Sequence, residues 1–258
     1  MPTLPEAIHK LGALPRDLPL AFVDVTFRWG SRTILDRVSL GLRHGETVAL
    51  IGPSGAGKTT MFRLALGFLT PAKGEVWVAG QEISRLDERE VARARTNVGI
   101  VFQDGALFTS MTVAENVAYG LAESGIAERE LAERVDRTLQ AVGMAELKER
   151  MPDELSGGQA QRVAVARAIV AEPRVMLYDE PTQGLDPKRA LGVVEQIRRL
   201  QTSGVASLVV THQLEYARLY ADRVALLNDG RLAYDGPVAG LKGLDDPFVR
   251  SFFEVLAG

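Results

Sequence analysis

The sequence predicts an α/β fold in which a mostly parallel sheet is covered by helices on both faces. Short apolar runs typical of buried strands alternate with segments of helical periodicity, and a glycine-rich turn joins one such run to a helix. A long helical stretch interrupts this alternation, which indicates an inserted helical lobe. At 258 residues, the chain is long enough for one large domain or two small ones.

The first 19 residues differ from the rest. Residues 1–19 contain four prolines, which disfavour a long helix, and they lack the basic start and apolar core of a secretory signal. We expect this lead-in to be poorly ordered. From Leu20–Phe27 onward the chain is rich in strand-forming residues, with turn signals at Gly30 and Gly45, so we expect N-terminal antiparallel strands.

The core strands are expected where short apolar runs occur. These runs are Thr47–Ile51, Val98–Phe102, Val175–Asp179, Ala206–Thr211 and Val224–Leu227. A helix is expected over Lys188–Gln201. Residues 104–167 are helical in character, and Leu131, Val135, Leu139 and Val142 share one helical face, as core packing requires. We therefore expect one domain over residues 20–258, with a core of residues 20–103 and 168–258 and a lobe of residues 104–167.

Composition narrows the class of protein. Hydrophobic residues make up 46% and charged residues 24%, as in ordinary globular proteins. The net charge of −3 gives no electrostatic basis for nucleic-acid binding, and the absence of cysteine excludes disulfides and thiolate metal sites. No stretch approaches the roughly 18 apolar residues of a membrane span. We expect a cytosolic chain that depends on a separate membrane subunit if it serves a membrane process.

A phosphate-binding loop follows the first core strand. Its residues are Gly52, Pro53, Ser54, Gly55, Ala56, Gly57, Lys58, Thr59 and Thr60. The glycines let backbone N–H groups surround a phosphate chain, Lys58 reaches the outer phosphates, and Thr59 offers a hydroxyl to Mg²⁺. An unliganded glycine-rich turn is the alternative, but every fixed position of the motif is filled. The sequence therefore predicts a nucleoside-triphosphate site.

A second motif lies at the start of another helical pattern. Leu155, Ser156, Gly157, Gly158 and Gln159 place a hydroxyl and two unhindered N–H groups at a helix N-terminus, where an anion is favoured. Taken alone, this is more often an ordinary helix cap. Together with the phosphate loop, it resembles the nucleotide-binding subunit of ABC transporters. The resemblance begins near Leu20, covers nearly all that follows, and implies a P-loop NTPase (RecA-like) core, ATP and Mg²⁺.

The resemblance assigns roles to residues that end other strands. Asp179 corresponds to the Walker B residue that holds Mg²⁺, and Glu180 to the residue that polarises the attacking water. Gln103 corresponds to the Q-loop glutamine, which joins the Mg²⁺ shell and reports the γ-phosphate, and His212 to the switch histidine. Carboxyl ends of parallel strands share one edge of a sheet, so we expect Asp179 and His212 to face the phosphate loop. The alternatives are a solvated loop for Asp179 and Glu180, a surface residue for Gln103 and a structural histidine for His212.

Two further positions follow from the resemblance. Asp186 matches the D-loop, which crosses to the partner subunit. Trp29 occupies the position of the aromatic residue that stacks on adenine, where tyrosine is commoner. A tryptophan buried in a strand is the alternative for Trp29.

The mechanism that we expect needs two copies of the chain. Ser156 and Gly157 lie in the helical lobe, so within one subunit we expect them not to reach the γ-phosphate held by Lys58. Two subunits packed head to tail would let each signature motif close the other's site. Binding of ATP would then close the pair, and hydrolysis would reopen it and move the membrane subunits.

The segment after Gln103 carries information about the partner. In this family that stretch lines the groove for the membrane subunit, and we expect Ala106, Leu107, Phe108 and Met111 to bind it. Its pattern is similar to Mce-type (Mla-like) phospholipid transporter ATPases, as is the tail Asp246–Phe252. The signature Leu155–Gln159 with Gln161 is closer to polar amino-acid importers, which remain the alternative. A soluble ABC ATPase of DNA repair or translation is a third class, disfavoured because there is one nucleotide domain and no long coiled-coil insertion.

These resemblances imply a set of partners. They are a second copy of the chain, an integral membrane permease, and an Mce-domain or other substrate-binding subunit. The location they imply is the cytoplasmic face of the cell (inner) membrane, reached peripherally through the permease.

Overall fold

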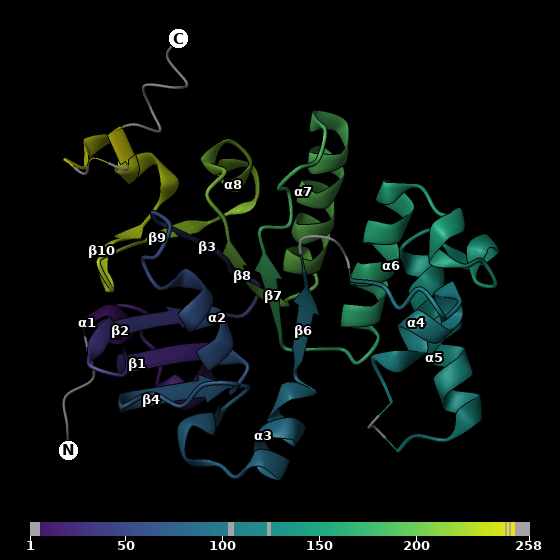
Figure 1. Ribbon diagram of the computed structural model, residues 1–258, viewed down its shortest axis with the longest axis horizontal. Helices are drawn as coiled ribbons and strands as arrows, with labels where there is room; N and C mark the ends of the chain where they lie inside the picture. The colour runs from purple at the N-terminus through teal and green to yellow at the C-terminus, as the bar shows by residue number, and fades with distance from the viewer. Residues whose placement is uncertain (1–5, 103–105, 123–124, 246, 248, 251–258) are drawn as a thin grey trace.

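The computed structural model describes residues 6–102, 106–122, 125–245, 247, 249 and 250. A six-stranded sheet runs through the centre of the molecule, in the order β10-β9-β3-β8-β7-β6 (Figure 1). All neighbouring strands are parallel except β10, which is antiparallel to β9. The strands are β3 (Thr47–Ile51), β6 (Val98–Val101), β7 (Val175–Asp179), β8 (Ala206–Val210), β9 (Arg223–Asn228) and β10 (Arg231–Gly236). The predicted mostly parallel sheet is confirmed.

Both faces of this sheet are buried. Alternate residues of β3 pack on opposite faces of the sheet. Val48 and Leu50 belong to the hydrophobic cluster shared with β1, β2 and α2, while Ala49 and Ile51 belong to the cluster shared with α7 and α8. This alternation follows from the two-residue period of a strand, and it explains why the core strands are continuous apolar runs. After residue 20, the described helices outside the lobe are α2 (Lys58–Ala65), α3 (Glu88–Arg95), α7 (Pro187–Thr202) and α8 (Leu214–Tyr220), with short 3₁₀ turns at Ile83–Arg85 and Val238–Gly243.

A second sheet, fully antiparallel, packs against the first. Its order is β2-β1-β4-β5, which confirms the expected N-terminal antiparallel strands. The strands are β1 (Leu20–Trp29), β2 (Arg32–Leu42), β4 (Lys73–Val78) and β5 (Gln81–Glu82). Their inward side chains join those of β3, β7 and β8 in one cluster, so the two sheets share a core.

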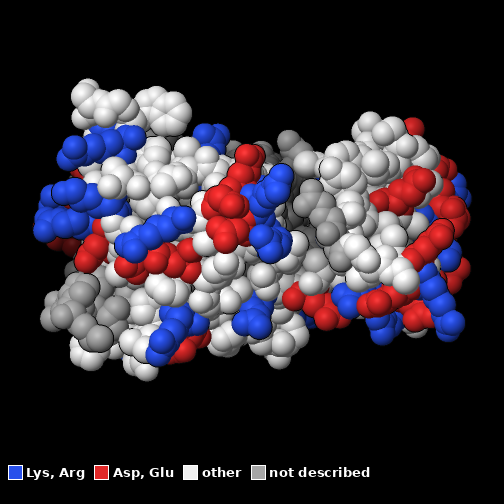
Figure 2. Space-filling view, turned by 90° about the horizontal axis from the view of Figure 1, so that it is seen from below, with Lys and Arg blue, Asp and Glu red and all other residues white. Residues whose placement is uncertain are grey.

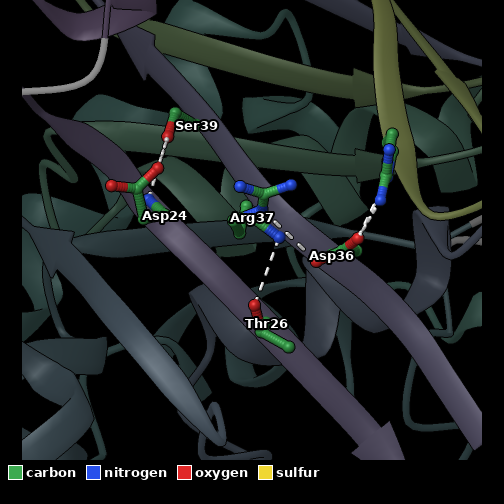
Figure 3. A network of polar contacts seen from close by, with 6 residues as sticks. Asp24, Thr26, Asp36, Arg37 and Ser39 are labelled. Atoms are coloured by element: carbon green, nitrogen blue, oxygen red, sulfur yellow. Dashed lines mark hydrogen bonds and ion pairs between the residues drawn. The ribbon is translucent and has the colours of Figure 1, made fainter.

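The β1–β2 hairpin is irregular, and side chains stabilise the irregularity (Figure 3). Asp24 and Arg37 adopt the left-handed conformation, with φ of 49° and 52°, at breaks in the strand register. Ser39 Oγ accepts from Asp24 N at 2.9 Å, and Thr26 Oγ1 accepts from Arg37 N at 3.2 Å. An ion pair between Asp36 and Arg231 then ties β2 to β10 of the other sheet.

The helical lobe lies to one side of the core (Figure 1). It contains α4 (Val113–Tyr119), α5 (Glu128–Ala141) and α6 (Gly157–Ile169), with 3₁₀ turns at Ala145–Leu147 and Pro152–Glu154. Val135 and Leu139 are buried on α5, as their spacing predicted, and Leu131 and Val142 pack around them. Helix α6 extends past residue 167, where we placed the end of the lobe.

That difference has a packing cause. Val163 and Ala166 of α6 join the lobe cluster, whereas Val165 and Ala168 join the core cluster beneath α7. One helix therefore serves both parts, and no boundary falls between them at this point.

The described part of the lead-in is folded, contrary to our expectation for residues 1–19. Residues 6–19 form α1 (Glu6–His9) and a 3₁₀ turn (Pro15–Asp17). Ile8 and Leu18 are buried against Ala21 of β1. Gly41 of β2 makes room for them, because a Cβ there would lie 2.6 Å from Leu11 Cδ1 and 2.8 Å from Leu18 Cδ1. Few apolar residues suffice here because they cover the outer face of an existing sheet.

Candidate functional site

The phosphate loop connects β3 to α2, and neighbouring strands enclose it. Gly52 has φ of 151°, and a Cβ there would lie 2.0 Å from the carbonyl oxygen of Leu227 on β9. Gly57 has φ of 109°, and a Cβ there would lie 2.7 Å from Leu35 Cδ2 on β2. A Cβ on Gly55 would meet nothing within 4 Å. The loop thus needs glycine where it touches the protein and stays open elsewhere, as a phosphate cradle requires.

Lys58 lies within this loop at the start of α2. Its Nζ donates to the carbonyl oxygens of Gly52 at 2.8 Å and Pro53 at 3.0 Å. Burial lowers the pKa of Lys58, and the nearby carboxylates of Glu180 and Asp179 oppose that shift. The ammonium is therefore partly desolvated and held by weak acceptors, so an anionic phosphate would be a stronger partner.

Asp179 and Glu180 come from β7, which β8 separates from β3. Burial raises the pKa of Asp179, and the neighbouring Glu180 carboxylate raises it further, while Lys58 and Arg63 act in the opposite direction. Two carboxylates close together in a half-buried place favour a cation. The structure thus brings the phosphate loop and the carboxylate pair together, although about 120 residues separate them in sequence.

His212 follows β8 and contacts Glu180. Its Nδ1 lies 2.9 Å from Glu180 Oε1, and its backbone N donates to Glu180 Oε2 at 3.2 Å. Glu180 has φ of 48°, a left-handed conformation that costs energy for a residue with a Cβ. The contacts with His212 hold the carboxylate in one orientation.

A second contact at this edge has no local signal in the sequence. Thr182, fully buried, donates its hydroxyl to Gln213 Oε1 at 2.5 Å. This bond joins the segment after Glu180 to the segment after His212. A buried threonine is visible only once the strands are paired.

The signature residues begin α6 as a complete helix cap. Ser156 Oγ accepts from Gln159 N at 3.3 Å, and Gln159 Oε1 accepts from Ser156 N at 2.7 Å. The ordinary capping function is therefore present. A Cβ on Gly158 would nevertheless meet nothing within 4 Å, so the N-terminus of α6 stays open to a ligand. The groove that Ser156–Gly158 line is completed by α7 and Asp186 rather than by the phosphate loop.

Trp29 lies at the end of β1 and is 67% exposed. The alternative of a tryptophan buried in a strand is therefore wrong. Its ring tilts against Phe27 with centroids 6.4 Å apart, which leaves much of the indole available for stacking.

Gln103 lies outside the described residues, and the expected partner-binding residues follow it. Leu107 packs into the lobe, whereas Phe108 is 37% exposed and its ring packs at a tilt of 54° against Tyr119, with centroids 4.4 Å apart. Ala106 has a left-handed φ of 45°, and its carbonyl oxygen accepts from Arg167 Nη1 at 2.7 Å.

Asn116, which the sequence did not single out, fixes this segment. It is fully buried on α4, and its Oδ1 accepts from Phe108 N at 2.8 Å. Its Nδ2 lies within hydrogen-bond distance of three carbonyl oxygens, those of Phe108, Met111 and Thr112. The backbone from Phe108 to Thr112 is thus held against the lobe, and the partly exposed Phe108 ring packs against Tyr119 and the Arg167 guanidinium.

Charge on the surface is mixed. Figure 2 shows basic and acidic side chains interspersed over one face of the molecule. Among the described residues of that face, no stripe of one sign would attract a polyanion over a distance.

Strand β3, the glycine loop that opens α2 and the carboxylate pair after β7 define a P-loop nucleotide-binding fold. Residues 35–183, more than half of the chain, match the family described as ABC transporter. The chain therefore belongs to the ABC transporter family, as its two motifs predicted. ATP-binding subunits of this family bind ATP with Mg²⁺ and couple its hydrolysis to transport.

Several curated proteins are similar. The chain is 38% identical over 225 residues to Fe(3+) ions import ATP-binding protein FbpC 1 of Haemophilus influenzae, covering 86% of this chain and 66% of that one. It is 38% identical over 229 residues to methionine import ATP-binding protein MetN of Geobacillus kaustophilus, covering 88% and 67%. It is 40% identical over 248 residues to protein TRIGALACTOSYLDIACYLGLYCEROL 3, chloroplastic, of Arabidopsis thaliana, covering 89% and 71%. The chain spans about two thirds of the length of these relatives.

Two solved structures share the fold. CbiO1 of Clostridium perfringens, part of the ABC transporter complex CbiONQ, matches with a TM-score of 0.81 and 30% identity over 88% of this chain and 91% of that chain. The ATP-binding cassette MJ0796, a dimer in a post-hydrolysis state with ADP and phosphate, matches with a TM-score of 0.72 and 30% identity over 85% and 98%. The predicted P-loop fold is confirmed. Iron and methionine importers are among the relatives, so the comparisons establish the family and not an Mce-type lipid transporter.

Within the described part of the chain, no helix has both the length and the apolar character needed to cross a bilayer.

Proposed function

We propose that this chain is the ATP-hydrolysing subunit of an ABC importer for a small solute, a metal ion or an amino acid. One observation carries the ATPase assignment: Lys58, Asp179 and Glu180 converge at one edge of the sheet with an open glycine loop beside them. That arrangement supplies a phosphate cradle, a place for a divalent cation and a carboxylate for water.

The residues would divide the work as follows. Phosphates would lie against the backbone of Gly52–Thr60 and Lys58, Mg²⁺ would bind through Thr59, Asp179 and Gln103, and Trp29 would stack on the base. Glu180, oriented by His212, would take a proton from the attacking water. Mg²⁺, when bound, neutralises phosphate charge as the outer phosphoryl group is transferred.

The assignment is tested by Glu180→Gln. The variant should keep ATP binding and lose at least about 100-fold in hydrolysis, because a general base typically contributes 10²- to 10⁴-fold. With Mg-ATP it should elute as a dimer in size-exclusion chromatography, whereas Lys58→Ala should stay monomeric. Turnover similar to that of the unsubstituted protein, with only monomer present, would refute the proposal.

The small-solute cargo is supported by the relatives. Iron and methionine import are the functions in the names of the two importers described above. The importer-like signature Leu155–Gln159 with Gln161 supports the same class. The sequence motifs also fit a polar amino-acid importer, and the iron and methionine importers among the relatives favour import of a small solute over lipid transport.

A lipid remains the second candidate because of two specific observations. The Arabidopsis relative carries a lipid, trigalactosyldiacylglycerol, in its name. The segment from Ala106 to Tyr119 is also similar to Mce-type phospholipid transporters. Deletion of the gene separates the candidates: loss of iron or amino-acid uptake with normal envelope permeability supports the importer, and the reverse result supports lipid transport.

Partners follow from the same assignment. Phe108 and the Tyr119 ring packed against it would contact a membrane permease, with Ala106, Leu107 and Met111 shaping the surface. A second copy of the chain would complete each ATP site, and a substrate-binding or Mce-domain subunit would join the same complex. The chain would then lie at the cytoplasmic face of the inner membrane, held there through the permease.

A further inference from the structure

Two helix N-termini meet in a groove between the lobe and the core. Helix α6 contributes Ser156, Gly157 and Gly158 to the groove, and α7 contributes Asp186 and Arg189. The groove has a volume of about 750 Å³. Each helix points the positive end of its dipole toward this part of the groove, although one N–H group of each first turn is capped, Gln159 N by Ser156 and Arg189 N by Asp186.

The side chains at these two N-termini add to that positive charge. The first turn of α6 has no acidic residue, and neither has the first turn of α7. The first turn of α7 instead carries Lys188 and Arg189. Cations are unfavourable at a helix N-terminus, where acidic residues are the rule. Asp186, the N-cap of α7, is the carboxylate that faces them at this end of the groove.

Arg189 is held directly over the start of α6. A Cβ on Gly157 would lie 3.0 Å from Arg189 Nη1 and 3.3 Å from its Cζ. Arg189 Nε pairs with Asp186 Oδ2 at 3.1 Å, and Arg189 N donates to Asp186 Oδ1 at 3.0 Å. The guanidinium is half exposed, so it can change partners without unfolding anything. Gly157 is thus the residue that gives this cation room beside the signature.

We propose that Arg189 is a phosphate-binding residue that acts with Ser156 and Gly158 on the nucleotide of the partner subunit. This inference rests on the proposed function. A planar guanidinium binds two phosphate oxygens at once, and the charge that is unfavourable in the isolated subunit becomes favourable when an anion arrives. Before that, Asp186 holds Arg189 in position; afterwards, Arg189 exchanges the carboxylate for the terminal phosphate.

The contribution of Arg189 to binding the partner's nucleotide can be measured from the ATP concentration at which half of the protein is dimeric. In a Glu180→Gln background, which should trap the dimer, Mg-ATP is titrated and the dimer is followed by light scattering. Arg189→Ala should raise the ATP concentration at the midpoint at least about tenfold, the effect expected for losing a charge-assisted hydrogen bond. Arg189→Lys should recover part of the loss, since it keeps the charge without the fork.

Lys188→Ala is the matched control. It removes the same charge from the same turn and the same groove, whereas the three atoms nearest to a Cβ on Gly157 all belong to Arg189. We expect its midpoint to move less than about twofold, since an exposed charge without a direct contact contributes little. Unchanged thermal midpoints for both variants would show that the fold is intact.

The other outcomes are decisive as well. Equal shifts for Arg189→Ala and Lys188→Ala would mean a general field rather than a contact, and an unchanged midpoint for Arg189→Ala would reduce Arg189 to an ion-pair partner of Asp186; either result overturns the inference. If the Glu180→Gln parent itself fails to dimerise with Mg-ATP, the proposed function fails, and the inference fails with it.

Discussion

At the scale of single residues, the centre of the site is electrostatically unfavourable without a ligand. Asp179 and Glu180 repel each other, and burial makes the ionised form of Asp179 costlier still. Lys58 relieves the repulsion only in part, because it is itself partly desolvated and bonded to carbonyl oxygens. A Mg²⁺ ion with a triphosphate would satisfy all three groups. Such groups stabilise a complex more than they stabilise the free protein.

Asp179→Asn should therefore stabilise the protein without nucleotide while removing its response to metal. The pKa of Asp179 is raised in the folded protein, so ionisation of this carboxyl lowers the free energy of unfolding. The contribution of Asp179 to that free energy is therefore greatest below the ordinary pKa of Asp, and it is lost as the pH rises through the higher pKa of the folded state. The variant should unfold at a higher temperature at neutral pH, and the difference should vanish in acid. Thermal denaturation at several pH values measures this.

The stabilisation of Asp179→Asn by Mg-ATP is the complementary measurement. At about 100 times its dissociation constant, a ligand adds about 2.7 kcal/mol to the unfolding free energy. Mg-ATP should raise the midpoint of the unsubstituted protein and raise that of Asp179→Asn much less. An Asn variant that is less stable than its parent at neutral pH would contradict this account of the site.

At the scale of elements, α4 and α6 hold the segment that we propose to face a permease. Asn116 of α4 fixes the backbone of Phe108 and Met111, and Arg167 of α6 fixes Ala106. Ser156 is the N-cap of the same helix α6. The proposed permease surface and the signature are thus connected through one helix that packs on both the lobe and the core.

Asn116→Ala should destabilise the lobe. It leaves the N–H of Phe108 and several carbonyl oxygens without their partner, which we expect to cost about 2–3 kcal/mol and to lower the melting temperature by about 5–10 °C. Phe108→Asp is the matched comparison, because this side chain is partly exposed and loses the ring contact with Tyr119 but no hydrogen bond, so the melting temperature should fall by less, at most about 4 °C.

Calorimetry and permease pull-down together decide between packing and docking at Phe108. If Phe108→Asp unfolds the lobe as Asn116→Ala does, Phe108 is a packing residue and the proposed permease surface is wrong. If Phe108→Asp loses permease binding while its melting temperature changes by no more than the small amount expected for it, the result supports a permease-binding surface at Phe108.

At the scale of the whole molecule, one edge of the sheet gathers the catalytic groups while the signature lies on the lobe. The phosphate loop follows β3, Asp179 ends β7 and His212 follows β8, three neighbouring strands. Ser156 lines a groove whose other wall is formed by residues of α7. A head-to-tail pair of subunits would join these two surfaces.

Mixing two inactive variants tests that arrangement. Lys58→Ala breaks the phosphate loop and Ser156→Arg blocks the signature, so each variant alone should be inactive. Pairing of the two variants gives heterodimers with one intact site and one doubly broken site, so part of the original ATPase activity should return. If activity stays absent while heterodimers form, crosslinking of Ser156 to the partner's phosphate loop decides whether the geometry is wrong or both sites must act together.

The sequence alone could predict those features that depend on residues close together along the chain. The glycine loop after an apolar run, the cap at Ser156 and the two-residue alternation of buried strands are patterns within a few residues, and they sufficed for the fold and the family. The assignments of single site residues stay predictions. For Gln103 the described residues add nothing.

Tertiary structure decided which residues meet when they are far apart in the sequence. Leu227 and Leu35 lie against the glycines of the phosphate loop, Arg189 lies over Gly157, and Ile8 packs against the outer face of β1. No local pattern marks these contacts, since each depends on two elements crossing at a particular distance. The physical reason is that a helix cap or a strand period is set by neighbouring backbone, whereas the room beside a glycine is set by whichever side chain the fold brings there.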